Sequence, residues 1–175
     1  ATMGFANNLA AGYRTVGRVA DAVRLDKETL RVWERVLGPE HPDTLVSRSN
    51  VATDYQALGR VTEAVALDEE TLRMREQVLG PEHPNTLSSR NNLAVGYRAL
   101  GRAAEAVSLH EETLRVRERV LGPEHPHTLI SRNNLAIGYR ALGRITEAVE
   151  LESLPHDDSS SESGGSGRPG TPPSR

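Results

Sequence analysis

The sequence predicts an all-α solenoid, in which antiparallel helix pairs stack one after another along the chain. A 42-residue internal repeat supports this prediction, because the four tyrosines recur at that spacing and a Gly-Arg pair begins four residues after each of them. A repeat of this length cannot bury its own apolar face, so neighbouring units must stack to form a continuous core. The tyrosines are Tyr13, Tyr55, Tyr97 and Tyr139, and the phrase LGPEHP recurs at 37–42, 79–84 and 121–126.

The second unit shows how each unit divides into two helices. Its first helix, helix A, is predicted from about Pro42 to Leu58, because proline at a first helical position needs no N–H donor and Gly59 breaks the pattern. Its second helix, helix B, is predicted from about Thr62 to Leu79, where the Gly-Pro of the connector stops it. Apolar residues at seven-residue spacing place one face of helix B in the core.

The period divides residues 1–154 into units at about 1–42, 43–84, 85–126 and 127–154. Ala1 aligns with the start of a helix A, and Pro155 limits the fourth helix B to about ten residues. We expect residues 155–175, which are rich in Ser, Gly and Pro, to be disordered. Terminal repeats normally carry a polar capping face, so we expect the chain to be part of a longer array with uncapped ends.

Composition excludes several classes of function. A net charge of −3 argues against bulk attraction to nucleic acid, and the absence of cysteine removes thiol chemistry and Cys-based zinc sites. No apolar run is long enough to span a membrane, and no secretory signal is apparent, so we expect a cytoplasmic protein. Lys27 is the only lysine among 21 basic residues, a bias that fits a GC-rich bacterial genome.

No catalytic or cofactor motif is present. The sequence lacks a Walker phosphate loop, a Gly-x-Ser-x-Gly elbow and a His-Glu-x-x-His motif, so we expect neither an enzyme nor a bound cofactor. His41, His83 and His125 precede prolines at helix starts, where we expect them to cap the helix. The pair His125 and His127 lacks further ligands nearby, so no metal site is expected.

The residues Leu93-Ala94, Tyr97 and Ala106 resemble the tetratricopeptide repeat pattern. The longer unit and its LGPEHPxTL connector are similar to the repeats of kinesin light chain and of bacterial sensor arrays. The resemblance covers roughly residues 1–152 and implies a right-handed superhelix whose A helices line a concave groove. The usual aromatic residues are replaced by arginine on helix A, and by aspartate or histidine on helix B. These departures are Arg48, Arg90 and Arg132, and Asp26, Asp68 and His110.

On a helical wheel, helix A has two distinct faces. Leu93, Tyr97 and Leu100 share the predicted core face, whereas Asn92 and its neighbours lie on the opposite face, which the resemblance places in the groove. The candidate groove residues are Asn8, Arg14, Asn50, Thr53, Gln56, Asn91, Asn92, Val95, Arg98, Asn133, Asn134, Ile137 and Arg140.

An asparagine amide both donates and accepts, so one asparagine per unit can hold the backbone of an extended peptide. Arg14, Arg98 and Arg140 form a predicted positive row that can pair with ligand carboxylates, and Gln56 interrupts it. The resemblance to kinesin light chain agrees with an acidic peptide. The alternative is that the asparagines bond to the neighbouring helix and only fix the stacking.

Three further features have simpler interpretations. Arg90 and Arg132 point toward the core, so we expect a buried stem and a head paired with a helix B glutamate. Trp33 replaces an arginine found in later units, and we expect it to pack on its own surface rather than anchor an interface. The acidic segment 151–158 is a weaker candidate for an inhibitory groove occupant.

The sequence therefore predicts a scaffold or sensor module that binds a protein or peptide and belongs to a larger regulatory protein. The main alternative is a structural solenoid that assembles head to tail, forming a homo-oligomer through uncapped ends. Nucleic-acid binding comes third, because 24 acidic residues oppose a contiguous basic stripe.

Overall fold

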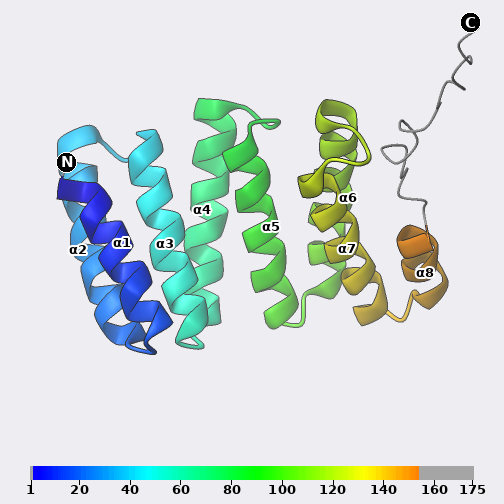
Figure 1. Ribbon diagram of the computed structural model, residues 1–175, viewed down its shortest axis with the longest axis horizontal. Coiled ribbons are helices and arrows are strands. Elements are labelled where there is room, and N and C mark those ends of the chain that lie inside the picture. Colours follow the sequence, from blue (N-terminus) through cyan, green and yellow to red (C-terminus); the bar gives the residue numbers. More distant parts are fainter. Residues whose placement is uncertain (1, 154–175) are drawn as a thin grey trace, which may run out of the picture.

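The computed structural model describes residues 2–153, and their side chains from residue 6 onward. These residues form eight helices in a row (Figure 1). Each helix packs against the next one along the chain. The helices are α1 Thr2–Thr15, α2 Val19–Leu37, α3 Pro42–Ala57, α4 Val61–Leu79, α5 Pro84–Ala99, α6 Ala103–Leu121, α7 Pro126–Ala141 and α8 Ile145–Ser153. The predicted all-α class is confirmed, and α3 and α4 match the predicted helices of the second unit to within one residue. The predicted disorder of residues 155–175 concerns a segment outside the described residues.

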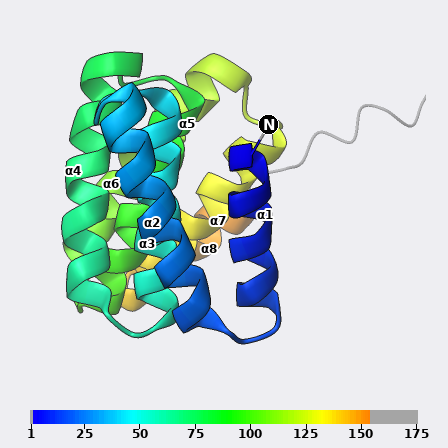
Figure 2. The same ribbon diagram turned by 90° about the vertical axis from the view of Figure 1, so that its left-hand side faces the viewer.

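The odd-numbered helices form one layer and the even-numbered helices form the other, as the view along the stack shows (Figure 2). Side-chain bonds cross directly between odd helices, from α1 to α3 and from α5 to α7. The odd helices correspond to helix A of each unit and the even helices to helix B. Each unit is therefore one hairpin that contributes one helix to each layer.

A contact between a tyrosine, an arginine and a carboxylate closes each hairpin, the carboxylate being Asp21 in the first and glutamate in the other three. Gly101 adopts φ +75°, a conformation that favours glycine and reverses the chain between α5 and α6. The Arg102 guanidinium then lies 3.9 Å from the centroid of the Tyr97 ring, and its Nε donates to Glu105 at 2.6 Å. The same stacking occurs in the other three hairpins, at 4.0 to 4.8 Å. The turn is therefore fixed by the first residues of helix B.

The LGPEHP connectors end helix B and begin the next helix A. Gly80 follows α4 with φ +88°, and His83 caps α5 by accepting the Asn85 backbone N–H at Nδ1, 3.1 Å away. His41 and His125 accept equivalent bonds, so the predicted capping role of the three histidines is confirmed.

The apolar core is small at each interface between hairpins. Val65, Leu72 and Leu93 form one buried cluster between α4 and α5. Gly96 brings these helices close together, since a Cβ atom there would lie 2.6 Å from Val65 Cγ2. The prediction that Leu100 belongs to the core is wrong: it is 37% exposed, because α5 ends at Ala99 and Leu100 is its C-terminal cap, where the chain leaves the helix.

Buried arginines supplement this core. Arg90 on α5 is only 4% exposed, and its guanidinium contacts Glu76 of α4 at 2.7 Å and Glu112 of α6 at 2.9 Å. Arg48 makes the same two contacts with Glu34 and Glu70. The predicted pairing of Arg90 with a helix B glutamate is therefore confirmed, and each such arginine joins three helices.

The same pairing is confirmed for Arg132, which lies 3.5 Å from Glu118. Within the described residues it has no second glutamate, and the position equivalent to Glu112 is Leu154 in the sequence.

A second set of buried arginines connects helix B to the next helix A, with one exception. Arg75 donates to Ser89 Oγ at 2.6 Å and to two backbone carbonyls, and Arg117 donates to Ser131 Oγ at 2.7 Å. In the first unit Trp33 takes this place, half-buried, with an indole N–H that has no acceptor. The corresponding Ser47 hydroxyl is also buried without a partner.

We expect Ser89→Ala and Ser47→Ala to affect stability differently. Ser89→Ala removes the acceptor of a charged donor and should lower the free energy of unfolding by about 2 kcal/mol. Ser47→Ala removes a hydroxyl that has no partner, so it should be neutral or slightly stabilising. Urea unfolding followed by circular dichroism measures both. Equal losses in the two variants would contradict this account of the arginine contact.

Candidate functional site

The exposed face of the odd-numbered helices carries three rows of side chains that run across the units. The central row contains asparagines at equivalent positions of successive A helices. Two rows of apolar or small polar residues flank it: one lies four residues before each asparagine in the sequence, and the other lies three residues after it. The central row is Asn50, Asn92 and Asn134, and the flanking rows are Val46, Ser88 and Ile130, and Thr53, Val95 and Ile137. Ile130 is 52% exposed and Ile137 is 38% exposed, so apolar surface is accessible beside the amides.

The asparagines divide into two groups. Asn134 donates from Nδ2 to Oδ1 of Asn91 at 2.6 Å, so this pair joins α7 to α5 as the stacking alternative anticipates. Asn50 and Asn92 are half-buried, and their amides make no hydrogen bond within the described part of the chain. Their amides are therefore available to a ligand. The other two candidates, Asn8 and Asn133, are exposed.

The arginines of the predicted positive row are mostly engaged within the chain. Arg14 donates from Nη1 to Asp26 at 3.0 Å and to Asp54 at 2.6 Å, and Arg140 pairs with Glu152 of α8. Arg98 makes no ion pair with any residue between 2 and 153. The reason is the residue twelve positions later on helix B, which is acidic opposite Arg14 and Arg140 but is histidine opposite Arg98. Among the residues that the structure describes, the row therefore offers one free cation rather than three.

Gln56 occupies the same position in the second unit and also turns toward helix B. Its Nε2 donates to Oδ2 of Asp68 at 3.3 Å. Asp26, Asp54 and Asp68 are at most 2% exposed, and His110 is 3% exposed, so a column of titratable groups lies between the two layers. A helical wheel of a single helix does not show this column, although the constant twelve-residue spacing between the helix A and helix B positions is a signal in the sequence.

Burial perturbs the groups of this column in opposite directions. It raises the pKa of Asp68 to about 7, with Gln56 and Arg75 opposing the shift. Burial and the nearby Asp54 raise the pKa of Asp26 to about 6 despite Arg14. For His110, burial lowers the pKa to about 4, and the positive charge of Arg98 adds to the effect. The Nδ1 atom of His110 is buried without a partner, so the third unit contains a neutral imidazole where its neighbours contain carboxylates.

No three His, Cys, Asp or Glu side chains within residues 2–153 form a group that could hold a metal ion. The rings of His125 and His127 are adjacent, with centroids 5.4 Å apart, but they form no part of such a group. Among the described helices, none is long and apolar enough to cross a membrane.

We expect Asp68→Asn to stabilise the protein at pH 8. The raised pKa means that the folded state binds this proton more tightly than the unfolded state, so wild-type stability falls as pH rises through about 7. Asparagine avoids the buried charge, so the free energy of unfolding should increase by about 1–3 kcal/mol at pH 8 and change little at pH 4. Urea unfolding at both pH values measures this, with Glu40→Gln in an exposed connector as control. A gain that is larger at pH 4 than at pH 8 would disprove the expected sign.

Comparison with solved structures identifies similar solenoids. Nearly identical TPR-like repeats of a kinesin light chain-like protein from Podosopora anserina are 38% identical to this chain, with a TM-score of 0.80. The match covers 85% of this chain and 71% of that one. BtubC (BKLC) from P. vanneervenii is 20% identical over 97% of this chain and 68% of its own, with a TM-score of 0.77. The apo form of RapI is 12% identical over 85% of this chain and 52% of its own, with a TM-score of 0.72.

The likenesses to BtubC and RapI show the fold alone, because their sequence identity is low. No curated protein matches the sequence. The tetratricopeptide repeat profile matches three overlapping segments, 2–76, 47–118 and 89–153, which together span the described helices. The chain belongs to the tetratricopeptide repeat family.

Proposed function

We propose that the chain binds an extended peptide segment of a partner protein across the exposed face of α1, α3, α5 and α7. Solenoids of this family are generally non-catalytic scaffolds for protein interactions. The observation that carries the proposal is the pair of unbonded amides, Asn50 and Asn92, at equivalent positions on adjacent A helices. A half-buried amide without an internal partner gains a hydrogen bond when a ligand covers it.

The chemistry of the three rows suits a peptide backbone. Each amide offers one acceptor and two donors, which match the N–H and C=O groups of an extended chain regardless of its sequence. The flanking rows supply apolar contact for side chains, through Val95 and Ile137 on one side and Ile130 on the other. Backbone bonds would therefore give affinity, and the flanking rows would give a preference for apolar side chains.

The charge of this face indicates how acidic the ligand should be. Arg98 is the one groove arginine without an ion pair in the described chain, so we propose a single acidic position in the ligand rather than a run of acidic residues. The role as a sensor or scaffold in a larger regulatory protein, the cytoplasmic location and the bacterial origin stay predictions from the sequence. The same holds for occupation of the groove by segment 151–158, which lies mostly outside the described residues.

A random twelve-residue peptide library selected against the wild-type protein tests the proposal. The double variant Asn50→Ala/Asn92→Ala should bind the selected peptides at least about tenfold more weakly, since it loses two hydrogen bonds of about 1 kcal/mol each. Gln77→Ala removes an exposed amide from α4 in the other layer and should leave the affinity unchanged. Titration calorimetry gives the affinities, and circular dichroism confirms that helicity is retained. Peptides that bind the double variant as tightly as the wild type would refute groove binding.

Self-association is a second candidate, favoured by apolar surface on α8. Ile145 and Val149 are 54% and 51% exposed and lie one turn apart on this helix. If they mediate stacking, the molar mass from light scattering should rise with concentration, and Val149→Glu should reduce that rise. Val36→Glu, at an equally exposed site on α2, is the matched control. A constant monomer mass over a hundredfold concentration range would exclude this candidate.

A further inference from the structure

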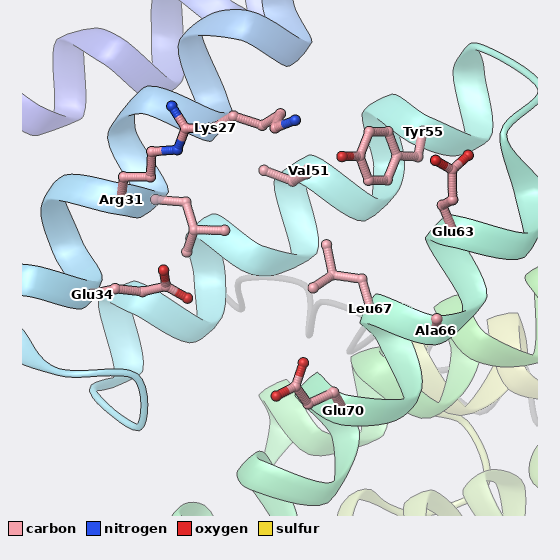
Figure 3. A pocket seen from close by; sticks show the side chains of 10 residues that line it. Lys27, Arg31, Glu34, Val51, Tyr55, Glu63, Ala66, Leu67 and Glu70 are labelled. Carbon is pink, nitrogen blue, oxygen red and sulfur yellow. The ribbon is translucent and has the colours of Figure 1, made fainter.

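A pocket of about 490 Å³ lies between α2 and α4, on the layer opposite the proposed peptide surface. Figure 3 shows α3 crossing beneath it, with Val51 and Tyr55 directed into the space between the two even-numbered helices. Leu30 and Leu67 complete an apolar floor, and charged side chains surround it. The volume lies within the range of small-molecule sites in proteins.

The charges around this pocket do not balance. Three glutamates line it, and all three contact an arginine: Glu34 and Glu70 share Arg48, at 2.7 and 2.8 Å, and Glu63 accepts from Arg60 at 2.8 Å. Lys27 and Arg31 also line it, one turn apart on α2, and neither forms an ion pair with a described residue. Neither cation contacts a carboxylate of the described residues, although Arg60 and, to a smaller extent, Lys27 lower the pKa of Glu63. With Arg48 and Arg60 counted, four cations surround three glutamates, so one positive charge is in excess.

The other interfaces of the same repeat show what is missing here. The residue equivalent to Lys27 is Glu69 in the second unit, and this glutamate accepts the Tyr97 hydroxyl at 2.7 Å. Glu111 accepts the Tyr139 hydroxyl at 2.8 Å in the third unit. An ammonium group cannot accept this bond, so the Tyr55 hydroxyl lacks the carboxylate that its two equivalents contact. Lys27 and Tyr55 instead point toward one another across the rim of the pocket (Figure 3).

The floor of the pocket also differs from its equivalents. Val51 stands where the later units have Leu93 and Leu135, so the side chain beneath the pocket is shorter by one methylene group. In the later units these leucines are buried in the core clusters between the helices. The loss of a carboxylate and the shortening of an apolar side chain thus coincide at one interface.

We propose that this pocket binds an amphiphilic carboxylate. The carboxylate head takes the place of the missing glutamate, between the Lys27 ammonium, the Arg31 guanidinium and the Tyr55 hydroxyl. The apolar body lies on Leu30, Val51 and Leu67, where it leaves water. The site is separate from the peptide surface and does not depend on it.

Octanoate is the probe that tests this assignment, measured by titration calorimetry on the whole chain. Wild-type protein should bind it, and Lys27→Glu should weaken binding at least about tenfold by restoring the carboxylate of the other units. Lys27→Arg keeps the charge and should stay within about threefold of wild type. Lys27→Glu should also raise the thermal unfolding midpoint, because the Tyr55 hydroxyl then gains an acceptor. A raised midpoint would show that the variant is folded and that its weaker binding does not result from unfolding.

A transplant provides the converse experiment. Glu69→Lys with Leu93→Val reproduces both differences at the next interface, and these changes should restore octanoate binding to the Lys27→Glu protein. Failure to do so would overturn the assignment of these two positions as the determinants.

Three other outcomes would overturn the proposal itself. They are no octanoate binding at millimolar concentration, binding of octanol as tight as that of octanoate, and binding of inorganic phosphate as tight as that of octanoate. The last two would show an apolar hollow or a simple anion site, respectively.

Discussion

The stacking of hairpins depends on a buried arginine in each of α3, α5 and α7, and in α3 and α5 this arginine lies between two helices B. Only 3% of the residues are aromatic, and the buried clusters at the interfaces hold only three aliphatic side chains each. Arg90 compensates by burying its stem in the interface while its guanidinium contacts glutamates of both flanking helices. A buried guanidinium without partners would be strongly destabilising, so these contacts fix the distance between successive hairpins.

The distance between successive hairpins determines how side chains are arranged on both surfaces of the solenoid. On the odd-numbered layer it aligns Asn50 with Asn92, so amides of different units form one row. On the even-numbered layer it leaves a space between α2 and α4, which is where the pocket of Figure 3 lies. Arg48 serves both functions, because it stabilises the stacking and also contacts two of the glutamates that line the pocket, offsetting one of their two negative charges. The excess of one positive charge around the pocket therefore depends on the arginines that stabilise the packing.

Local and repeated features could be predicted from the sequence, and contacts between units largely could not. Pro42 and Gly80 act within their own turns, so the helix ends agree to within one residue. A helical wheel gives the direction of a side chain from its own axis but not what the next helix presents. The pairing of Arg14 with Asp54, forty residues later, was therefore not predicted, and the bond from Asn134 to Asn91 was anticipated only as the stacking alternative, without its partner named. In the sequence Lys27 stands out only as the single lysine, because its role depends on Tyr55, which lies in another helix.

Because the units repeat, comparing equivalent positions shows where one unit differs from the others. Two kinds of difference can be distinguished. At Trp33 the arginine of later units is lost, and two buried polar groups are left without partners. This lowers the stability of the interface, but neither group is accessible to a ligand. At Lys27 the departure leaves charge beside an open volume with an apolar floor. The first kind weakens an interface, whereas the second creates a surface that an external molecule can complete. A departure from the repeat therefore indicates a binding site only where the unsatisfied group is accessible, and Lys27 meets that condition where Trp33 does not.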